Sequence, residues 1–131
     1  TPGANNGLGI RTPLNADPAY AGMELQILDD TAPQYAKLKK SQYHGSIYKC
    51  ADAKLGHLKP IGEWNTQEVI CIGKHVKVTL NGTVITDAYL DLLPTYEKHK
   101  GMKRDKGYIG FLGHGAPIEF RNIKIKKHWY Y

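Results

Sequence analysis

Hydrophobic and polar residues alternate most clearly in the stretch 23–28, M-E-L-Q-I-L. Its apolar residues occupy one parity and Glu24 and Gln26 occupy the other, which is the period of a half-buried β-strand. An acidic pair, Asp29 and Asp30, ends the stretch. Because Glu is depleted in strands, this ladder of polar side chains is compatible with a lined groove. A solvated outer face with a polar strand end is the other interpretation, and the stretch alone leaves both open.

Seven further segments show the same alternation or a short apolar run bounded by turn residues. Asn81 and Gly82 form a two-residue turn between two of them, and both residue types accept the positive φ of a type I′ hairpin turn. In the last segment the apolar parity slips, which predicts a β-bulge near Arg121 and Asn122. The predicted strands comprise residues 7–12, 23–28, 45–50, 67–72, 75–80, 83–88, 106–112 and 118–127.

The connections between these strands are long and polar, and no segment has the length and period of an ordinary helix. About eight short strands with such connections predict an all-β sandwich or barrel. The 131 residues allow one domain with a useful core, and 14 Gly, 7 Pro and 9 Tyr are typical of a turn-rich β protein. No apolar run approaches the length of a membrane span.

The formal net charge of +6 raises the question of nucleic acid. The basic residues gather in 37–40, 98–106 and 124–127, which are separated clusters flanked by turn residues. None forms a helical stripe or a strand with interleaved aromatic residues that could stack bases, so we expect solvated loops and no nucleic-acid partner. Cys50 and Cys71 are the two cysteines. They are either two buried thiols or one disulfide between neighbouring strands, and the sequence leaves this open.

One wet face of the predicted sheet carries candidate ligand-binding groups. Arg11 points away from the apolar residues of its strand, as Glu24 and Gln26 do in theirs, and Tyr48 alternates in the same way. A guanidinium beside a carboxylate and a carboxamide offers fixed donors and acceptors to a hydroxyl-rich ligand. Aromatic rims beside polar groups are typical of sugar sites. The aromatic residues in the flanking loops are Tyr20, Tyr43 and Trp64.

His44 and His114 each adjoin a glycine at a predicted strand end. A histidine there can project from the rim of a sheet and act as a general acid or base, or as a metal ligand. An exposed or hydrogen-bonded loop histidine is the alternative for each. The sequence contains no serine or cysteine nucleophile elbow, P-loop, dinucleotide fingerprint or zinc-spaced cluster.

Several stretches, taken in order, resemble the 3-keto-disaccharide hydrolase family, and the resemblance covers almost the whole chain. It implies a concanavalin A-like, laminin-G-like β-jelly-roll sandwich, related also to laminarinase-type glucanases. This expectation agrees with the strand pattern. The stretches are N-N-G-L-G-I-R-T, Y-A-G-M-E-L-Q-I-L-D-D, Y-H-G-S-I-Y, P-I-G-E-W-N, V-K-V-T-L-N-G-T-V-I and G-Y-I-G-F-L-G-H-G-A-P-I-E-F-R-N-I-K-I.

The resemblance implies cleavage of the glycosidic bond of 3-keto-glycosides, by hydrolysis or by elimination. A 3-keto group acidifies the C2 proton, so a base can remove it and the C1 substituent can leave before water adds across the enone. That route needs a base, an acid and an electrophile for the enolate oxygen. Some related enzymes use a divalent metal as this electrophile, and the resemblance leaves open whether this chain does.

Carried over position by position, the resemblance marks nine polar residues. We expect Glu24 and His44 to be the acid/base groups or, if a metal is bound, its ligands. Arg11, Gln26 and Asn65 are assigned to substrate hydroxyls or the keto oxygen. The full set is Arg11, Glu24, Gln26, Asp29, His44, Tyr48, Trp64, Asn65 and His114.

The spacing Glu24-x-Gln26-x-x-Asp29 also resembles the E-x-D-x-x-E strand of laminarinase-type retaining glucanases. The middle acid is Gln here and the last is Asp. This departure argues against a double displacement with two carboxylates.

Two hypotheses follow. An enzyme would cluster Glu24, His44 and Arg11 in one concave pocket with perturbed pKa values. A non-catalytic, lectin-like carbohydrate-binding module would present an aromatic platform and would keep its function after Glu24→Gln. A structural module whose basic loops bind an acidic partner is a third, weaker option.

The family domain normally has several strands before the position of Thr1. This chain therefore resembles the C-terminal part of a jelly roll, and we expect residues 1–131 to be one incomplete domain. Without those strands, strand edges and apolar faces would be exposed. The expected partner is the N-terminal part of the same domain or another chain. The resemblance further implies a periplasmic or cell-surface setting in Bacteroidota.

Overall fold

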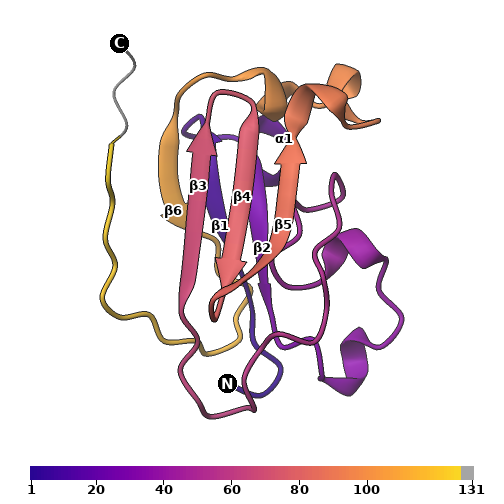
Figure 1. Cartoon of the computed structure of the whole chain (residues 1–131), viewed down its shortest axis with the longest axis vertical. Coiled ribbons are helices and arrows are strands. Elements are labelled where there is room, and N and C mark those ends of the chain that lie inside the picture. Colours follow the sequence, from indigo (N-terminus) through magenta and orange to yellow (C-terminus); the bar gives the residue numbers. More distant parts are fainter. Residues whose placement is uncertain (128–131) are drawn as a thin grey trace.

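The computed structural model describes residues 1–127 and is a sandwich of two antiparallel sheets (Figure 1). The first sheet has the order β2-β1-β6 and the second has the order β3-β4-β5. The strands are β1 (Asn5–Thr12), β2 (Met23–Leu28), β3 (Gln67–Ile72), β4 (His75–Leu80), β5 (Thr83–Tyr89) and β6 (Tyr108–Phe111). The helices are α1 (Pro18–Ala21), η1 (Pro33–Tyr35), η2 (Lys40–Gln42), η3 (Leu90–Leu92), η4 (Tyr96–Lys98) and η5 (Lys100–Lys103).

The core lies between the two sheets and is built from their alternating apolar residues. Met23 and Leu25 of β2 belong to the same buried cluster as Val76, Val78 and Leu80 of β4. All five side chains are at most 2% exposed. Nearly complete burial of an apolar side chain stabilises the fold by roughly 1.5–3 kcal/mol for each large side chain. The alternation seen in the sequence therefore sets which face of each sheet points inward.

Six of the eight predicted strands are present. Residues 23–28, 67–72 and 75–80 match β2, β3 and β4, and the other three agree to within a few residues. The turn at Asn81 and Gly82 has φ of 49° and 85°, the positive values that a type I′ turn requires. The predicted all-β sandwich is confirmed.

The predicted strand at 45–50 is wrong. Ile47 makes single bridges with Leu25 and with Ala51. Lys49 has a φ of 59°, and the amide of Cys50 donates to the carbonyl of Ile47. The chain therefore touches the edge of β2 over a few residues and then turns back, so no ladder extends along it.

The predicted strand at 118–127 is not formed either. These residues carry no strand assignment, and nearly all are exposed. Because this segment forms no strand pairing, the predicted β-bulge is absent. Asn122 nevertheless has a φ of 54°, which bends the chain at the predicted place. Among residues 1–127 no strand lies beside this segment and pairs with it.

Cys50 and Cys71 are both free and half-buried, so the structure favours two thiols over a disulfide. Burial raises the pKa of each, opposed by Thr95 at Cys50 and by Arg11 and Lys74 at Cys71. Both thiols therefore remain protonated and weakly nucleophilic at neutral pH.

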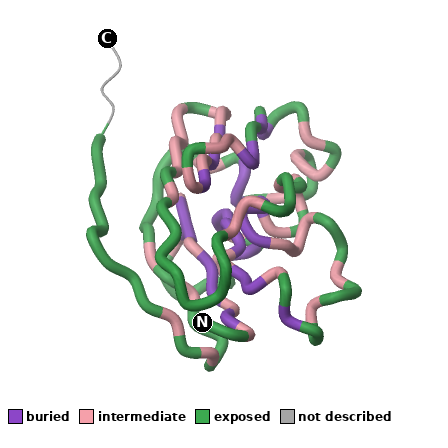
Figure 2. Tube along the Cα trace, turned by 60° about the horizontal axis from the view of Figure 1, so that its bottom comes forward, coloured by how far each residue is buried: buried purple, intermediate pink, exposed green. Residues whose placement is uncertain are grey.

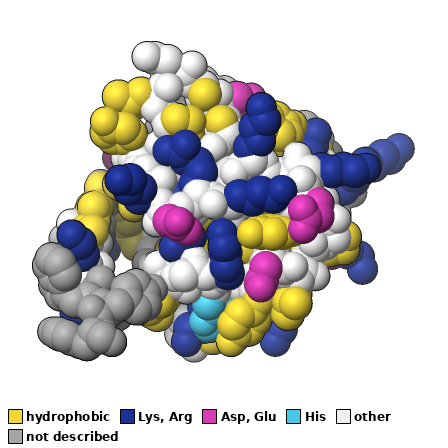
Figure 3. All heavy atoms as spheres, turned by 90° about the horizontal axis from the view of Figure 1, so that it is seen from above, with side chains coloured by type: hydrophobic (Ala, Val, Ile, Leu, Met, Phe, Trp, Pro, Cys, Tyr) yellow, Lys and Arg dark blue, Asp and Glu magenta, His cyan; other side chains and the backbone are white. Residues whose placement is uncertain are grey.

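Charged groups are mixed on the surface. On the face that Figure 3 shows, Lys and Arg side chains are spread out and stand among Asp and Glu side chains. This distribution supports solvated loops, and the absence of a nucleic-acid partner stays a prediction. Within residues 1–127, the helices are too short or too polar for a membrane span.

Candidate active site

The polar face of the first sheet is built by strand register. In the pairing of β1 with β2, Gly7 lies opposite Gln26 and Gly9 lies opposite Glu24. Residues opposite each other in an antiparallel pair project to the same face, so two glycines leave room beside the two polar side chains. A Cβ on Gly7 would overlap the Glu24 carboxylate. Gly7 therefore makes the position of that carboxylate possible.

A cavity of about 220 Å³ opens on this face. Its walls come from β1, β2, the α1 region, the segment after β2 and the loop after β6. Of the nine residues marked by the sequence, four meet here. They are Glu24, Gln26, Tyr48 and His114, joined by Asn5, Asp17, Ala19 and Tyr20.

Glu24 carries the unusual electrostatics of the cavity. The residue is 6% exposed, and burial raises the pKa of its carboxyl. Asp17 raises this pKa further, while His114 opposes the shift. The His114 Nε2 lies 3.9 Å from Glu24 Oε1. Within the described chain this carboxyl accepts no hydrogen bond from a protein donor. Stabilisation of its negative charge is therefore left to His114 and to any group that binds in the cavity.

Gln26 and Tyr48 are fixed by a short hydrogen-bond chain. Gln26 Nε2 donates to the carbonyl of Gln42 at 3.0 Å, and Gln42 Nε2 donates to the hydroxyl of Tyr48 at 3.2 Å. The backbone amide of Tyr48 donates to the carbonyl of Glu24 at 2.8 Å. Because the Tyr48 oxygen accepts from Gln42, its own proton stays free to be donated elsewhere.

Asp17, Asn5 and Ala19 were missed by sequence reasoning. Asp17 caps α1, and its Oδ1 accepts from the amide of Ala19 at 3.0 Å. The signal was present, since Asp followed by Pro is a typical helix start. Asn5 shares the parity of Gly7 and Gly9, so strand alternation places it on the same face. The Oδ1 of Asn5 is buried without a hydrogen-bond partner in residues 1–127.

Arg11 does not join this site, and the prediction that it shares a face with Glu24 is wrong. Its backbone has a φ of 50°, and the pairing of β1 with β6 shifts register between Gly9 and Thr12. This irregularity reverses the parity on which the prediction depended. The guanidinium donates instead to the carbonyls of Gly73, at 2.6 Å, and Arg104, at 3.3 Å.

His44 is also remote from the cavity, so the predicted cluster with Glu24 is wrong. Its Nδ1 accepts from the amide of Leu28 at 3.2 Å, and its Nε2 lies 2.8 Å from Gln67 Oε1. Leu28 is four residues beyond Glu24, which is about 13 Å along a strand. Burial lowers the pKa of His44, opposed by the bond to Gln67. Both ring nitrogens are thus used inside the fold.

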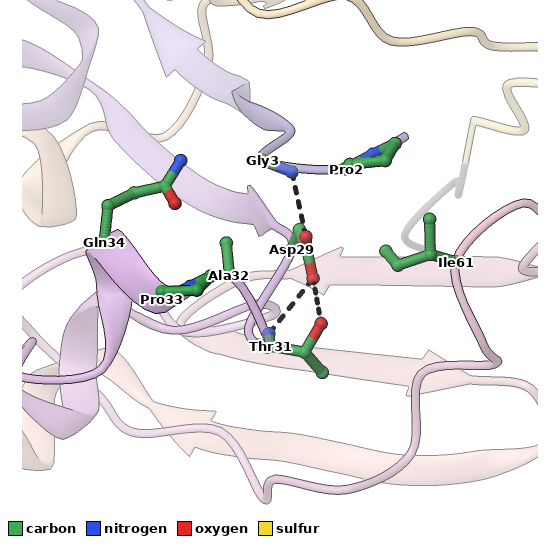
Figure 4. Close-up of a pocket in the computed structure, with 8 residues that line it drawn as sticks. All are labelled: Pro2, Gly3, Asp29, Thr31, Ala32, Pro33, Gln34 and Ile61. Carbon is green, nitrogen blue, oxygen red and sulfur yellow. Dashed lines mark hydrogen bonds between the residues drawn. The ribbon is translucent and has the colours of Figure 1, made fainter.

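Asp29 lines a different cavity, of about 420 Å³, shown in Figure 4. Its carboxylate accepts from the amide of Gly3 at 2.8 Å, and from the amide and hydroxyl of Thr31 at 3.0 and 2.6 Å. Burial opposes ionisation, but these hydrogen bonds outweigh it and lower the pKa of Asp29. The carboxylate ties the chain start to the end of β2, away from Glu24.

Trp64 and Asn65 lie in a surface loop outside both cavities. The Trp64 ring is 3.9 Å from the guanidinium carbon of Arg121, so that face of the indole is covered by a cation–π contact. Asn65 Oδ1 accepts from the amide of Lys59 at 2.9 Å and from Asn81 Nδ2 at 2.8 Å. Of the three aromatic residues expected at the rim, only Tyr20 lines the cavity of Glu24.

The residues do not assemble a metal-binding set. Among residues 1–127 no three His, Cys, Asp or Glu side chains are grouped as metal ligands. Glu24 and His44, the two candidates from the sequence, lie apart, and His44 has no free nitrogen. We therefore derive no chemical step through a metal.

Comparison with known proteins agrees with this fold. One curated relative, the 3-keto-disaccharide hydrolase of Bacteroides thetaiotaomicron, is 28% identical over 132 residues. The match covers 84% of this chain and 46% of the relative. The chain thus spans about half the length of that protein.

Two crystal structures from Parabacteroides distasonis, each described as a putative glycosyl hydrolase, also match. The first is 27% identical with a TM-score of 0.76, and the match covers 87% of this chain and 66% of that one. The second is 21% identical with a TM-score of 0.64, covers 88% and 61%, and bears on the fold alone.

A family model describes the 3-keto-alpha-glucoside-1,2-lyase-like domain, and it matches residues 1–126. This range includes every strand of both sheets and all residues of the Glu24 cavity. The chain belongs to the 3-keto-alpha-glucoside-1,2-lyase-like domain family.

Proposed function

We propose that this chain is a carbohydrate-active enzyme that cleaves the glycosidic bond of a 3-keto-glycoside in the Glu24 cavity. The observation that carries the proposal is a buried carboxyl with a raised pKa, 3.9 Å from a histidine and open to a cavity. A raised pKa brings a carboxyl closer to neutral pH, where it can take up and release a proton efficiently. The family and the curated relative support the choice of substrate class.

The cavity offers a group for each proton transfer of an elimination. Glu24, as carboxylate, takes the C2 proton, and the electron pair moves into an enolate at C3. The enolate then re-forms the ketone as the C1–C2 double bond forms and the bond from C1 to the leaving oxygen breaks. His114, when protonated, donates to that oxygen. Water then adds across the double bond.

The developing enolate needs a hydrogen-bond donor, and Tyr48 supplies one. Its hydroxyl oxygen accepts from Gln42, which leaves its proton available toward the cavity. Gln26 keeps one amide N–H and its oxygen for substrate hydroxyls, since it donates only once within the described fold. Asn5, whose Oδ1 is buried without a hydrogen-bond partner in residues 1–127, also lines the cavity.

The test is cleavage of 3-keto-trehalose by the protein at the length its gene encodes, with and without a chelator. Glu24→Gln keeps the shape of the side chain and removes its acid/base chemistry. We expect it to lower kcat by about 10²–10⁴-fold. Glu63→Gln, an exposed change in the loop before β3, is the matched control and should leave the rate unchanged.

A lectin-like, non-catalytic module is the second candidate. The aromatic Tyr20 at the cavity rim is 50% exposed, as a sugar-stacking residue would be. Retained glycan binding by both parent and Glu24→Gln, with no cleavage by a folded parent, would favour this candidate and overturn the enzyme.

A further inference from the structure

The Glu24 cavity has a closed end and an open end. The side chain of Glu24 is 7% exposed, whereas that of His114 is 49% exposed. When Glu24 takes the C2 proton and His114 protonates the leaving oxygen, the keto ring lies inward and the leaving group points outward. The cavity volume of about 220 Å³ is below the roughly 300–1,000 Å³ of pockets that bury a drug-sized ligand. The leaving group therefore lies at the mouth of the cavity.

Tyr20 stands at this mouth on an anchored turn. The residue lines the cavity and is 50% exposed. It belongs to α1, which Asp17 caps at its start. The Nε2 of His99 lies 2.9 Å from the carbonyl oxygen of Ala19 and fixes the same turn to η5. An anchored aromatic ring that is half exposed offers a stacking surface to a leaving group.

Lys49 reaches the same mouth from the segment after β2. Its Nζ donates to the Tyr20 hydroxyl at 3.4 Å and lies 5.6 Å from the centre of the Tyr48 ring. Both tyrosines line the cavity, so the ammonium stands beside its opening. Lys49 has a φ of 59°, which is uncommon outside glycine, and strained backbone of this kind clusters at ligand sites. Figure 2 shows the connecting segments largely exposed or half-buried around a buried interior.

Tyr20 and Lys49 present hydrogen-bond donors at the mouth. Among residues 1–127, Lys49 forms no ion pair, either with Asp17 on the cavity wall or with any other acid. Its ammonium keeps two N–H groups, and the Tyr20 oxygen already accepts, so the phenol proton stays free to be donated. Such donors suit an oxyanion. The buried carboxyl of Glu24 would repel an oxyanion from the closed end, so the two charges together orient the substrate.

We propose that Tyr20 and Lys49 form a subsite that selects substrates whose leaving group carries an oxyanion, such as a carboxylate. This rests on the proposed function and names the class of leaving group. The leaving group lies against the Tyr20 ring, and its oxyanion accepts from Lys49. Its glycosidic oxygen takes the proton from His114 as the bond to C1 breaks. Lys49 determines specificity and takes no part in the bond cleavage.

Two matched substrates test the subsite on the protein at the length its gene encodes. They are the 3-keto-glucosides of 4-hydroxybenzoate and 4-hydroxybenzamide, which are nearly equal in size and differ in charge. The readout is the ratio of their kcat/KM values relative to the ratio in the parent, because intrinsic reactivity then cancels. We expect Lys49→Met to lower this ratio about 3–10-fold and Lys49→Arg to keep most of it. Lys54→Met, at another exposed lysine, removes the same charge and should leave the ratio unchanged.

Salt separates an effect of charge from an effect of shape. Because Lys49 is exposed, the preference for the benzoate should shrink as sodium chloride rises from about 0.05 to 0.5 M. A preference that salt leaves unchanged would contradict the proposal. A ratio that Lys49→Met does not lower, or that Lys54→Met lowers equally, would overturn it as well.

Binding separates a failure of the subsite from a failure of the proposed function. Cleavage of both glycosides with no dependence on Lys49 would leave the proposed function standing and remove the subsite. When the parent cleaves neither, the proposed function fails, and calorimetric binding of the same two compounds decides on the subsite. Tighter binding of the benzoate that Lys49→Met abolishes would support it. Equal binding of the two, or binding of neither, would overturn it.

Discussion

Burial of the Glu24 carboxyl has a cost that depends on pH. The group is almost fully covered, and burial raises its pKa above the ordinary value of 4.5. The stability that comes from the neutral form is fully present below pH 4.5 and is lost as the pH rises through the raised pKa. At neutral pH the folded chain therefore holds an unfavourable charge where its proposed chemistry takes place, as is common in active sites.

This cost predicts that Glu24→Gln stabilises the protein at neutral pH. We expect the variant to melt about 2–5 °C above the parent at pH 7, and the difference to vanish near pH 4, where both side chains are neutral. Thermal melts of both proteins at several pH values check this. A variant that melts below the parent at pH 7 would mean that the carboxylate, rather than the acid, is the favoured form.

Gly7 gives a second prediction at the scale of one residue. A methyl group at this position would overlap the Glu24 carboxylate. Gly7→Ala should therefore displace the carboxylate and lower kcat/KM by at least about tenfold, since a small misplacement is costly in catalysis. Gly110→Ala in β6 is the control, because a Cβ there meets no atom within 4 Å. Unchanged activity of Gly7→Ala would show that this carboxylate position is not needed.

At the scale of elements, the His44 side chain links β2 to β3. It receives the amide of Leu28 in β2 and bonds to Gln67 in β3, so one imidazole links the two sheets. Its pKa is lowered from 6.5 by burial, and the bonding pattern requires the neutral ring. The stability conferred by neutral His44 is complete above pH 6.5 and declines as the pH falls below it.

Removal of the His44 side chain, which links the two sheets, should destabilise the fold. His44→Ala leaves a buried amide without an acceptor and creates a small cavity, which together cost about 2–4 kcal/mol. Between pH 6.5 and 5, the stability of the variant should also fall less than that of the parent. Denaturant unfolding at pH 7.5 and 5 measures both effects. His57→Ala, in a surface loop, is the control and should change stability by less than about 0.5 kcal/mol. A similar effect of the two variants would refute the proposed link between the sheets through His44.

Differences between the elements also explain which strands could be predicted from the sequence. The local pattern was sufficient for β2, β3 and β4, because each of these strands pairs along its length with another strand of the chain. Residues 118–127 also alternate on either side of a slip in parity but have no partner strand among residues 1–127, and pairing is not a local property. For residues 45–50 the decisive feature was the left-handed backbone at Lys49, which the alternating pattern did not signal.

For the whole molecule, alternation located the polar wall of the cavity and failed wherever the backbone is irregular. Glu24 and Gln26 were placed correctly because β2 is regular. Arg11 was misplaced because a register shift precedes Thr12. His44 was misjudged because a glycine neighbour at a strand end gives no information on what the ring meets. His114 reaches Glu24 across 90 residues of sequence, and its place depended on the resemblance.

The position of His114 has a consequence for regulation. This histidine follows β6, whose Ile109 and Phe111 are 54% and 43% exposed, so the least buried strand of the first sheet positions one half of the Glu24 pair. Whatever orders β6 also orders the imidazole, and a ligand that fixes the imidazole holds β6 in place. Order in β6 and occupation of the cavity would then be thermodynamically linked, each favouring the other by the same factor.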